Sequence, residues 1–254
     1  MQLVVREVSQ ENNTNVLMKL TANEPLPQMF PGQFAQLKVE NSPSTYLRRP
    51  ISINFFDEEK NEVWFLISAV GAGTRALSSL KKGDTLDCLL PLGNSFSLPE
   101  DKNARILLVG GGVGVAPMYF LGTQLVALGY KPEFLLGARR ADLLCETKLF
   151  EAVAPLHIST EDGSLGEKGL VTSHSILSNT NNFTHIYTCG PKPMMVAVAH
   201  LAKKRSVFCE VSLENLMACG LGACLCCVEN TVKGNICVCK EGPVMNINQL
   251  LWQI

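Results

Sequence analysis

The sequence predicts a β + α/β fold in three parts: an antiparallel β-barrel, a doubly wound parallel sheet and a small cysteine-rich subdomain. Short alternating segments separated by turn residues fill the chain up to residue 99. From residue 104 the pattern becomes an apolar strand followed by a helix, and it repeats. Six of the ten cysteines then fall between residues 219 and 239. These patterns predict domains at 1–99, 100–205 and 206–254.

The composition is that of a globular protein with packed cores. Of 254 residues, 46% are hydrophobic and 18% are charged, and the net charge is −1. Lys and Arg are scattered, so neither a nucleic-acid surface nor a membrane surface is indicated.

Residues 106–130 are uncharged and long enough to span a bilayer, but glycines and Pro117 interrupt them, which favours strand, turn and helix. Met1 leads into a charged segment unlike a signal peptide, which predicts a cytoplasmic protein with reduced thiols.

The first domain carries the closely spaced strands of a barrel or sandwich. Alternating segments are expected as strands near residues 3–8, 16–20, 34–39, 51–56, 62–70 and 84–90.

Two motifs beside these strands have groups that can bind an anion. In Arg48-Arg49-Pro50-Ile51-Ser52, one arginine and the serine hydroxyl can hold a phosphate. In Gly71-Ala72-Gly73-Thr74, backbone N–H groups can do the same. Together the two motifs predict a pyrophosphate bound by the barrel.

The second domain alternates strands with helices, which predicts a parallel sheet. Strands are expected near 104–110, 132–139, 155–160 and 185–190, and helices near 116–128, 146–152 and 191–203. The loop Gly110-Gly111-Gly112-Val113-Gly114 follows a strand and opens a helix, as in nucleotide-phosphate loops. It departs from the dinucleotide fingerprint because Pro117 stands at the third glycine position.

Two features of this domain leave alternatives open. No acidic residue ends the next strand, where a ribose-binding carboxylate usually lies. Arg139 and Arg140 stand there instead, and they either bind the 2′-phosphate of NADP or face water. The loop Cys189-Gly190-Pro191 follows a later strand, at the edge where such sheets bind ligands. Cys189 either lines a nicotinamide pocket or is a buried structural thiol.

The cysteine spacing predicts an iron–sulfur centre. Cys219, Cys224 and Cys227 form C-x4-C-x2-C, the loop spacing of a plant-type [2Fe–2S] cluster, which takes a fourth thiolate from elsewhere. Cys226 competes with Cys227, and the C-x2-C spacing selects Cys227. Structural zinc sites typically use two short C-x2-C knuckles, so this pattern favours a cluster over zinc.

The motifs and their order resemble the ferredoxin reductase superfamily, and within it the electron transfer subunits of NAD-dependent (type B) dihydroorotate dehydrogenases. The resemblance covers nearly the whole chain. RRPISI and VGAGTRALS resemble flavin segments, GGGVGVAP, TEDGSLGEKGLVT and CGPKPMM resemble pyridine-nucleotide segments, and MACGLGACLCCVE with VCKEGPV resembles a cluster-binding tail. The last phrase selects Cys239 over Cys237 as the fourth ligand.

The resemblance implies three cofactors: FAD in the barrel, NAD in a Rossmann-like second domain and a [2Fe–2S] cluster in the tail. The implied FAD residues are Arg49, Pro50, Ile51, Ser52, Leu66, Ile67, Ser68, Gly73 and Thr74. The implied NAD residues are Gly110, Gly111, Gly112, Gly114, Glu161, Asp162, Gly163, Cys189, Gly190 and Pro191. The implied cluster ligands are Cys219, Cys224, Cys227 and Cys239.

The implied activity converts between two-electron and one-electron transfer in pyrimidine biosynthesis. Electrons pass from dihydroorotate, oxidised on a partner catalytic (FMN) subunit, through the cluster and FAD to NAD⁺, in a heterotetramer of two copies of each subunit. No acid–base residue is expected in this chain, because hydride transfer to a flavin requires stacking and exclusion of water. Val244-Met245 or Leu250-Leu251-Trp252 either meet that partner or cap the tail against the barrel.

Two other functions are consistent with the motifs. The nearest alternative is a flavin and iron–sulfur subunit of a sulfide- or ferredoxin-linked NAD(P)H oxidoreductase. A different class is a redox sensor that holds a cluster without turnover.

Overall fold

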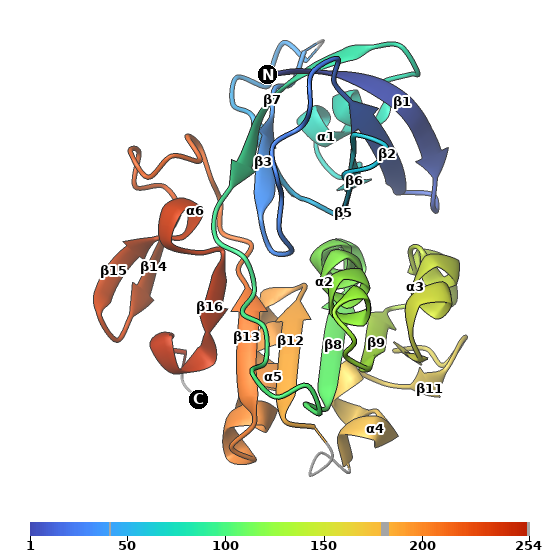
Figure 1. The fold of residues 1–254 in the computed structure, drawn as a ribbon, viewed down its shortest axis with the longest axis vertical. Helices are drawn as coiled ribbons and strands as arrows, with labels where there is room; N and C mark the ends of the chain where they lie inside the picture. The colour runs from blue at the N-terminus through green and yellow to red at the C-terminus, as the bar shows by residue number, and fades with distance from the viewer. Residues whose placement is uncertain (41, 179–182, 253–254) are drawn as a thin grey trace.

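Two seven-stranded sheets and a short C-terminal hairpin make up the chain in a computed structural model, which describes residues 1–40, 42–178 and 183–252 (Figure 1). The antiparallel sheet lies at one end of the molecule and the mainly parallel sheet at the other. The cysteine-rich tail runs alongside both. The predicted β + α/β class is confirmed.

The first sheet curves like a barrel, with strands in the order β4-β3-β7-β1-β2-β6-β5. It contains β1 (Gln2–Gln10), β2 (Asn15–Thr21), β3 (Phe34–Leu37), β4 (Arg49–Ser52), β5 (Phe55–Asp57), β6 (Glu62–Ser68) and β7 (Thr85–Leu92), and α1 (Ala72–Ser78) follows β6. Alternation sets which residues fill it. In β1, for example, Leu3 and Val5 are buried, whereas Gln2 and Arg6 are exposed. The curvature brings β4 against β6, so two of the predicted flavin segments are neighbours.

The second sheet has the order β11-β10-β9-β8-β12-β13-β16, and every pairing in it is parallel except that of β13 with β16. Its strands are β8 (Ile106–Gly111), β9 (Pro132–Ala138), β10 (Leu156–Thr160), β11 (Glu167–Lys168), β12 (His185–Cys189), β13 (Phe208–Ser212) and β16 (Val244–Asn246). Its helices are α2 (Val115–Ala127), α3 (Thr147–Val153), α4 (Ser175–Ser178) and α5 (Lys192–Lys204), with short 3₁₀ turns η1 (Gly112–Gly114), η2 (Ala141–Leu143) and η3 (Val171–Ser173).

Strand β8 shows why helices cover both faces of this sheet. Ile106 and Leu108 point into the core beneath α2, whereas Leu107 and Val109 point into the core beneath α5. A strand buried on both faces must be apolar at every position, unlike the alternating strands of the barrel. This difference in pattern is what separates the two domains in the sequence.

The C-terminal tail is built onto the second sheet. It contains the hairpin β14 (Val228–Thr231) and β15 (Gly234–Cys237), then α6 (Val238–Glu241), β16 and the 3₁₀ turn η5 (Ile247–Gln249). Strand β16 pairs antiparallel with β13, which buries Val244 and Met245. Leu250 is also buried, while Leu251 is 52% exposed. Met245 and Leu250 therefore cap the tail against the second sheet, rather than against the barrel as the second expectation had it.

A buried polar contact joins the barrel to the second sheet. Asn54, between β4 and β5, donates from Nδ2 to Oε1 of Glu146 at 2.8 Å, just before α3. Burial raises the pKa of Glu146 to about 8, so its carboxyl group is protonated at neutral pH. A neutral acid at this interface avoids the cost of an uncompensated buried charge.

Among the helices in the described ranges, none combines the length and apolarity needed to cross a bilayer.

We predict that Gly122→Ala destabilises the protein. Gly122 lies in α2, and a Cβ there would be 2.2 Å from Cζ of Phe134, whose buried ring packs edge-on against Phe150 at 4.8 Å. Ala normally stabilises a helix relative to Gly, but here overpacking should reverse the sign and lower the free energy of unfolding by about 1–3 kcal/mol. Urea unfolding measures this effect. The adjacent Thr123→Ala is the control, and an equal loss in both variants would contradict the packing explanation.

Candidate nucleotide, flavin and cluster sites

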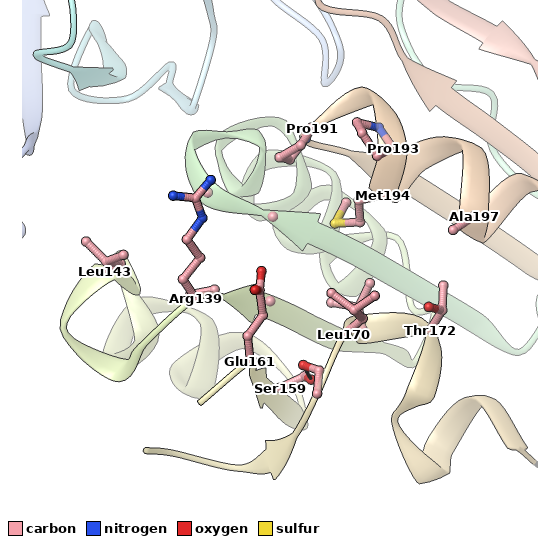
Figure 2. Close-up of a pocket in the computed structure, with 16 residues that line it drawn as sticks. Arg139, Leu143, Ser159, Glu161, Leu170, Thr172, Pro191, Pro193, Met194 and Ala197 are labelled. Carbon is pink, nitrogen blue, oxygen red and sulfur yellow. Dashed lines mark hydrogen bonds between the residues drawn. The ribbon is translucent and has the colours of Figure 1, made fainter. Parts of the chain in front are cut away.

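A cavity of about 430 Å³ lies at the carboxyl ends of the parallel strands, beside the N-terminal part of α5 (Figure 2). The order of the strands reverses between β8 and β12, and doubly wound sheets bind ligands at such a switch point. The lining residues come from the ends of β8, β9 and β10, the turn before η3 and the start of α5. They are Gly111, Gly112, Gly137, Ala138, Arg139, Leu143, Ser159, Glu161, Gly169, Leu170, Val171, Thr172, Pro191, Pro193, Met194 and Ala197.

Glycines let the two loops at the switch point touch backbone to backbone. A Cβ on Gly114 would lie 2.5 Å from both the carbonyl carbon of Cys189 and Cα of Gly190. A Cβ on Gly111 would lie 2.5 Å from Sδ of Met194. The η1 turn begins at this contact and runs directly into the thirteen-residue α2, whose first N–H, that of Val115, donates to the Gly112 carbonyl; neither element has a side-chain cap. The arrangement is suited to a phosphate group.

The predicted nucleotide residues divide into two groups. Gly111, Gly112, Glu161 and Pro191 line the cavity. The others lie beside it: Gly110, Gly114, Asp162, Gly163, Cys189 and Gly190. The thiol of Cys189 is fully buried and lies 3.8 Å from Oε1 of Glu214, and burial raises its pKa well above the usual range. The structure thus places Cys189 as a buried thiol that shapes its loop.

The structure gives different positions, relative to the cavity, to the side chains of Arg139, Arg140 and Glu161. Arg140 forms an ion pair with Asp142, with Nη2 2.5 Å from Oδ2, outside the cavity. Arg139 and Glu161 both line the cavity and reach toward the same part of it (Figure 2). The sequence pattern placed the ribose-binding carboxylate at the end of the strand after the glycine loop. The carboxylate that reaches the cavity is Glu161, which the family resemblance named; it follows β10, one strand later, at the shared sheet edge.

The lining residues missed by sequence reasoning have one signal in common. Ser159, Gly169, Leu170 and Thr172 lie on β10 or on the turn that follows β11. Because the carboxyl ends of β8, β9 and β10 meet at one edge, any loop following these strands was a candidate. Gly169, Leu170 and Thr172 fall within TEDGSLGEKGLVT, the phrase that resembles a pyridine-nucleotide segment, although they were not named one by one; Ser159 lies just before it.

The two predicted flavin motifs of the barrel meet at Arg49. A Cβ on Gly73 would lie 2.9 Å from Nε of Arg49, so the arginine lies directly over the start of α1. Thr74 closes this turn, because its Oγ1 accepts from the Gly71 N–H at 3.0 Å. Arg49 has no carboxylate partner among the described residues and donates only to the carbonyls of Leu47 and Arg48. Its charge is therefore available to a phosphate group.

Arg48 has a structural role instead. Its Nη2 lies 2.6 Å from Oδ2 of Asp87 on β7, and its Nη1 donates to the Asp87 carbonyl at 2.8 Å. This contact with Arg48 holds the pKa of the Asp87 carboxyl below its usual value. The structure thus separates two adjacent arginines that the sequence motif did not distinguish.

The remaining flavin segments lie next to the nucleotide loop. Pro50, Ile51 and Ser52 are half-buried on β4. On β6, Leu66 packs in the core beneath α2, whereas Ile67 points into the barrel. Strand β6 contacts the η1 turn of the glycine loop. A flavin along β4 and β6 would therefore face a nucleotide bound at the switch point.

The four predicted cluster cysteines lie in two pairs. Cys219 and Cys224 lie on the outer loop and are partly or fully exposed, whereas Cys227 and Cys239 are buried and the Cys239 N–H reaches Sγ of Cys227 at 3.3 Å. The Leu221 N–H reaches Sγ of Cys219 at 3.3 Å, and the Gly222 N–H reaches Sγ of Cys239 at 3.1 Å. In the described part of the chain, no three His, Cys, Asp or Glu side chains converge as a single metal ion requires. The preference for a [2Fe–2S] cluster over zinc therefore rests on the C-x4-C-x2-C spacing.

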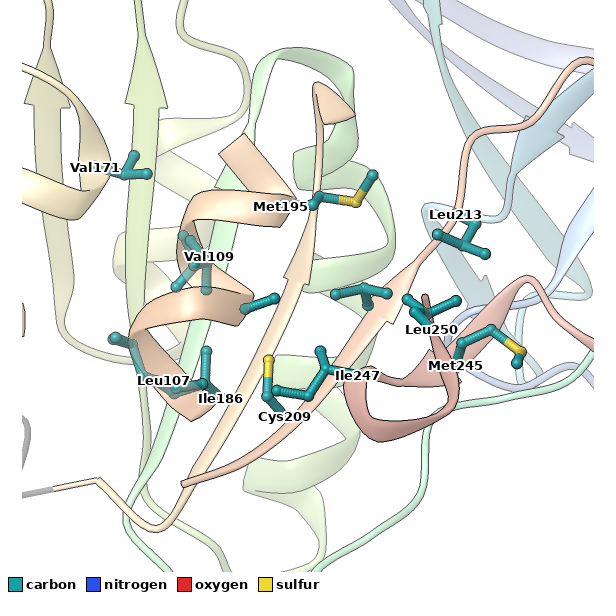
Figure 3. Packing of buried hydrophobic residues seen from close by; sticks show 14 of the residues in the cluster. Leu107, Val109, Val171, Ile186, Met195, Cys209, Leu213, Met245, Ile247 and Leu250 are labelled. Atoms are coloured by element: carbon teal, nitrogen blue, oxygen red, sulfur yellow. The ribbon is translucent and has the colours of Figure 1, made fainter. Parts of the chain in front are cut away.

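The surroundings of these thiols differ. The N–H groups of Leu221, Cys224 and Ala223 lower the pKa of Cys219 to about 6, whereas burial raises that of Cys239 to about 12. Cys227 and Cys239 lie in the core shared by α5, Leu213 and Met245, part of which Figure 3 shows. One thiol pair is therefore anchored in the second sheet and the other is carried by the outer loop.

The two competing cysteines lie close to the predicted ligands. Cys226 is exposed, as is the predicted ligand Cys224. The Sγ of Cys237 lies 3.8 Å from the carbonyl of Gly222, on the loop between Cys219 and Cys224. The choice of Cys227 and Cys239 over these neighbours therefore stays a prediction, based on the spacing and on the family phrase.

Comparisons with known proteins agree with this geometry. Residues 214–251 match the iron–sulfur cluster binding domain of dihydroorotate dehydrogenase B, and residues 108–200 match an oxidoreductase NAD-binding domain. The electron transfer subunit of dihydroorotate dehydrogenase B (NAD(+)) from Shouchella clausii is 40% identical over 87% of this chain and 86% of its own length. That from Listeria monocytogenes is 40% identical over 91% of each chain. This chain belongs to that family.

Solved structures with the same fold include other reductases. A NADH-dependent reduced ferredoxin-NADP oxidoreductase is similar to this family member with a TM-score of 0.88 and 27% identity, over 98% of this chain and 90% of that one. Phthalate dioxygenase reductase matches with a TM-score of 0.69 and 18% identity over 94% of each chain, which shows the fold alone.

We predict that Arg49→Gln weakens FAD binding by about 10- to 100-fold. A hydrogen bond to a charged group is worth about 1.5–3 kcal/mol, and Gln removes the charge while keeping a polar side chain. Quenching of FAD fluorescence on titration with apoprotein gives the Kd. The matched control, Arg48→Gln, loses the Asp87 pair and should lower stability without changing the FAD Kd. Equal Kd increases in the two variants would contradict the assignment.

We predict that Cys226→Ser and Cys237→Ser keep the cluster, whereas Cys224→Ser and Cys227→Ser lose it. The spacing and the family phrase leave out the first two thiols, and the spacing includes the second two. Iron and sulfide content after anaerobic reconstitution, with visible absorption, measures retention. A Cys226→Ser variant without a cluster, beside a Cys227→Ser variant with one, would reverse the ligand assignment.

Proposed function

We propose that this chain is the electron transfer subunit of a dihydroorotate dehydrogenase B, and that it delivers electrons from a catalytic partner to NAD⁺. The observation that carries the proposal is the contact of three sites in one chain. The flavin strand β6 touches the nucleotide loop, and the paired cysteines lie in a tail built onto the nucleotide sheet. The reaction oxidises dihydroorotate to orotate, a step of pyrimidine biosynthesis.

The residues of this chain fit three cofactors: FAD, NAD and a [2Fe–2S] cluster. Arg49 and the turn at Gly73 would hold the FAD pyrophosphate, the glycine loop would hold NAD, and the two thiol pairs would hold the cluster. When bound, FAD exchanges hydride with the nicotinamide and single electrons with the cluster. The chain contributes binding, orientation and exclusion of water, so no acid–base residue is assigned.

The nucleotide cavity supports NAD rather than NADP as the natural acceptor. Glu161 at its lining would accept hydrogen bonds from a ribose 2′-hydroxyl and would repel a 2′-phosphate. Arg139 faces the same space, but Arg140 is already paired with Asp142. A second arginine is thus not available to complete a phosphate site.

The loop around the cluster cysteines offers a surface for the catalytic subunit. Leu216, Leu221 and Leu225 are 85%, 60% and 65% exposed, and they lie between or beside the cluster ligands. Leu225 also has a left-handed backbone with φ of 58°. Leucines exposed beside a one-electron carrier suit a partner that covers them. We propose this surface, rather than the buried Val244 and Leu250, as the contact with an FMN-containing subunit in a tetramer of two copies of each.

We predict that this chain and its catalytic partner, purified together, reduce NAD⁺ with dihydroorotate, and that the catalytic partner alone does not. Under anaerobic conditions NADH should bleach the flavin and cluster absorption of this chain, and NADPH should do so with at least about tenfold lower kcat/KM because Glu161 opposes its phosphate.

Stopped-flow absorption with both nucleotides measures this difference. A reconstituted pair that turns over dihydroorotate with another acceptor but not with NAD⁺ would contradict the proposed function. Absence of bleaching by either nucleotide would indicate a cluster-binding sensor instead.

A further inference from the structure

Gln36 is a buried polar side chain with no partner. It lies on β3 with no exposed surface, and neither its Nε2 nor its Oε1 has a hydrogen-bond partner in the described structure. Native proteins pair nearly all buried polar side-chain atoms, because an unpaired amide loses its hydrogen bonds to water without replacement. An apolar residue at this position of the core would avoid that loss.

The position of Gln36 connects two of the sites. Across the barrel sheet its backbone pairs with Pro50, within the flavin strand β4. Its side chain lies against the cluster loop, since a Cβ on Gly220 would be 2.7 Å from its Cγ and 3.0 Å from its Nε2. Gly220 has a left-handed φ of 71° and directly follows Cys219. The unpaired amide is thus directed at the loop that carries one thiol pair.

Neighbouring contacts hold Gln36 in this place. Phe34, two residues earlier on β3, packs in the same core as Cys227 and Cys239. A Cβ on Gly93 would lie 2.5 Å from Cδ of Pro243, and the Asn94 N–H donates to the Gly242 carbonyl at 2.7 Å. The barrel and the tail therefore meet along β3, and the amide cannot turn to solvent.

We propose that Gln36 raises the reduction potential of the cluster, because its carboxamide N–H donates to the sulfur atoms carried by the Cys219 loop. This inference rests on the proposed cluster site. N–H donors to cluster sulfur stabilise the more negative reduced form, so they raise the reduction potential. The cluster supplies the acceptor that the amide lacks in the chain alone.

The test uses Gln36→Met, which keeps the length of the side chain and removes its polar atoms, in the complex with the catalytic subunit. The midpoint potential of the [2Fe–2S] centre is measured by an EPR-monitored redox titration. We expect a fall equivalent to a tenfold change in the ratio of reduced to oxidised cluster, about 59 mV for one electron. Gln36→Glu, which removes the donor but keeps the shape, should also lower the potential.

The matched control is Gln33→Met. Gln33 lies just before β3, and its amide is already paired with the Phe30 N–H at 2.8 Å and the Gly93 carbonyl at 3.0 Å. The control should leave the potential at its wild-type value. A wild-type potential in either Gln36 variant, or an equal shift in Gln33→Met, overturns the inference. A wild-type complex without a [2Fe–2S] signal would instead refute the proposed cluster site.

Discussion

The pairing of β16 with β13 is the constraint on which the arrangement of the three sites depends. It fixes Val244 and Met245 at the edge of the nucleotide sheet, and thereby fixes α6 and Cys239 immediately before them. The turn between α6 and β16 contacts both domains, because the Gly242 carbonyl accepts from Asn94 after the barrel strand β7 and the Pro243 carbonyl accepts from Leu213 after β13. One short antiparallel strand thus ties the tail to both larger domains.

The arrangement of the three sites also requires glycines where two segments of the chain come close together. Gly114 lets the glycine loop touch the Cys189 loop, Gly73 makes room for Arg49, and Gly220 makes room for Gln36. At each point a side chain would separate two segments that belong to different sites. The glycines therefore set the distances between nucleotide, flavin and cluster, over which electrons must pass.

Polar side chains buried between the domains differ in their hydrogen bonding. Asn54 donates to the buried carboxyl group of Glu146, whose pKa is raised to about 8 by burial. The amide of Gln36, by contrast, has no hydrogen-bond partner in the described part of the chain. The first contact lies between the barrel and α3, and it leaves Oδ1 of Asn54 and Oε2 of Glu146 without a hydrogen-bond partner. Gln36 differs because both polar atoms of its amide are unpaired and because its side chain lies against Gly220 in the cluster loop. Its place beside that loop is the reason for assigning Gln36 to the cluster rather than to the fold.

Local pattern alone determined the fold class, the order of the motifs and the prediction of three cluster cysteines, because periodicity and spacing are carried by residues close in the chain; the prediction of Cys239 came from the family resemblance. The change from alternating to fully apolar strands at residue 104 predicted the second sheet, and that class was confirmed. The family resemblance had named Arg49 and Glu161, and tertiary structure supplied the physical reason, because Arg48 is paired with Asp87 and Glu161 lies at the sheet edge. Tertiary structure alone showed which buried amide faces the cluster loop. Each of these depends on partners far away in sequence, Asp87 for Arg48, the sheet edge for Glu161 and Gly220 for Gln36, and no local pattern records them.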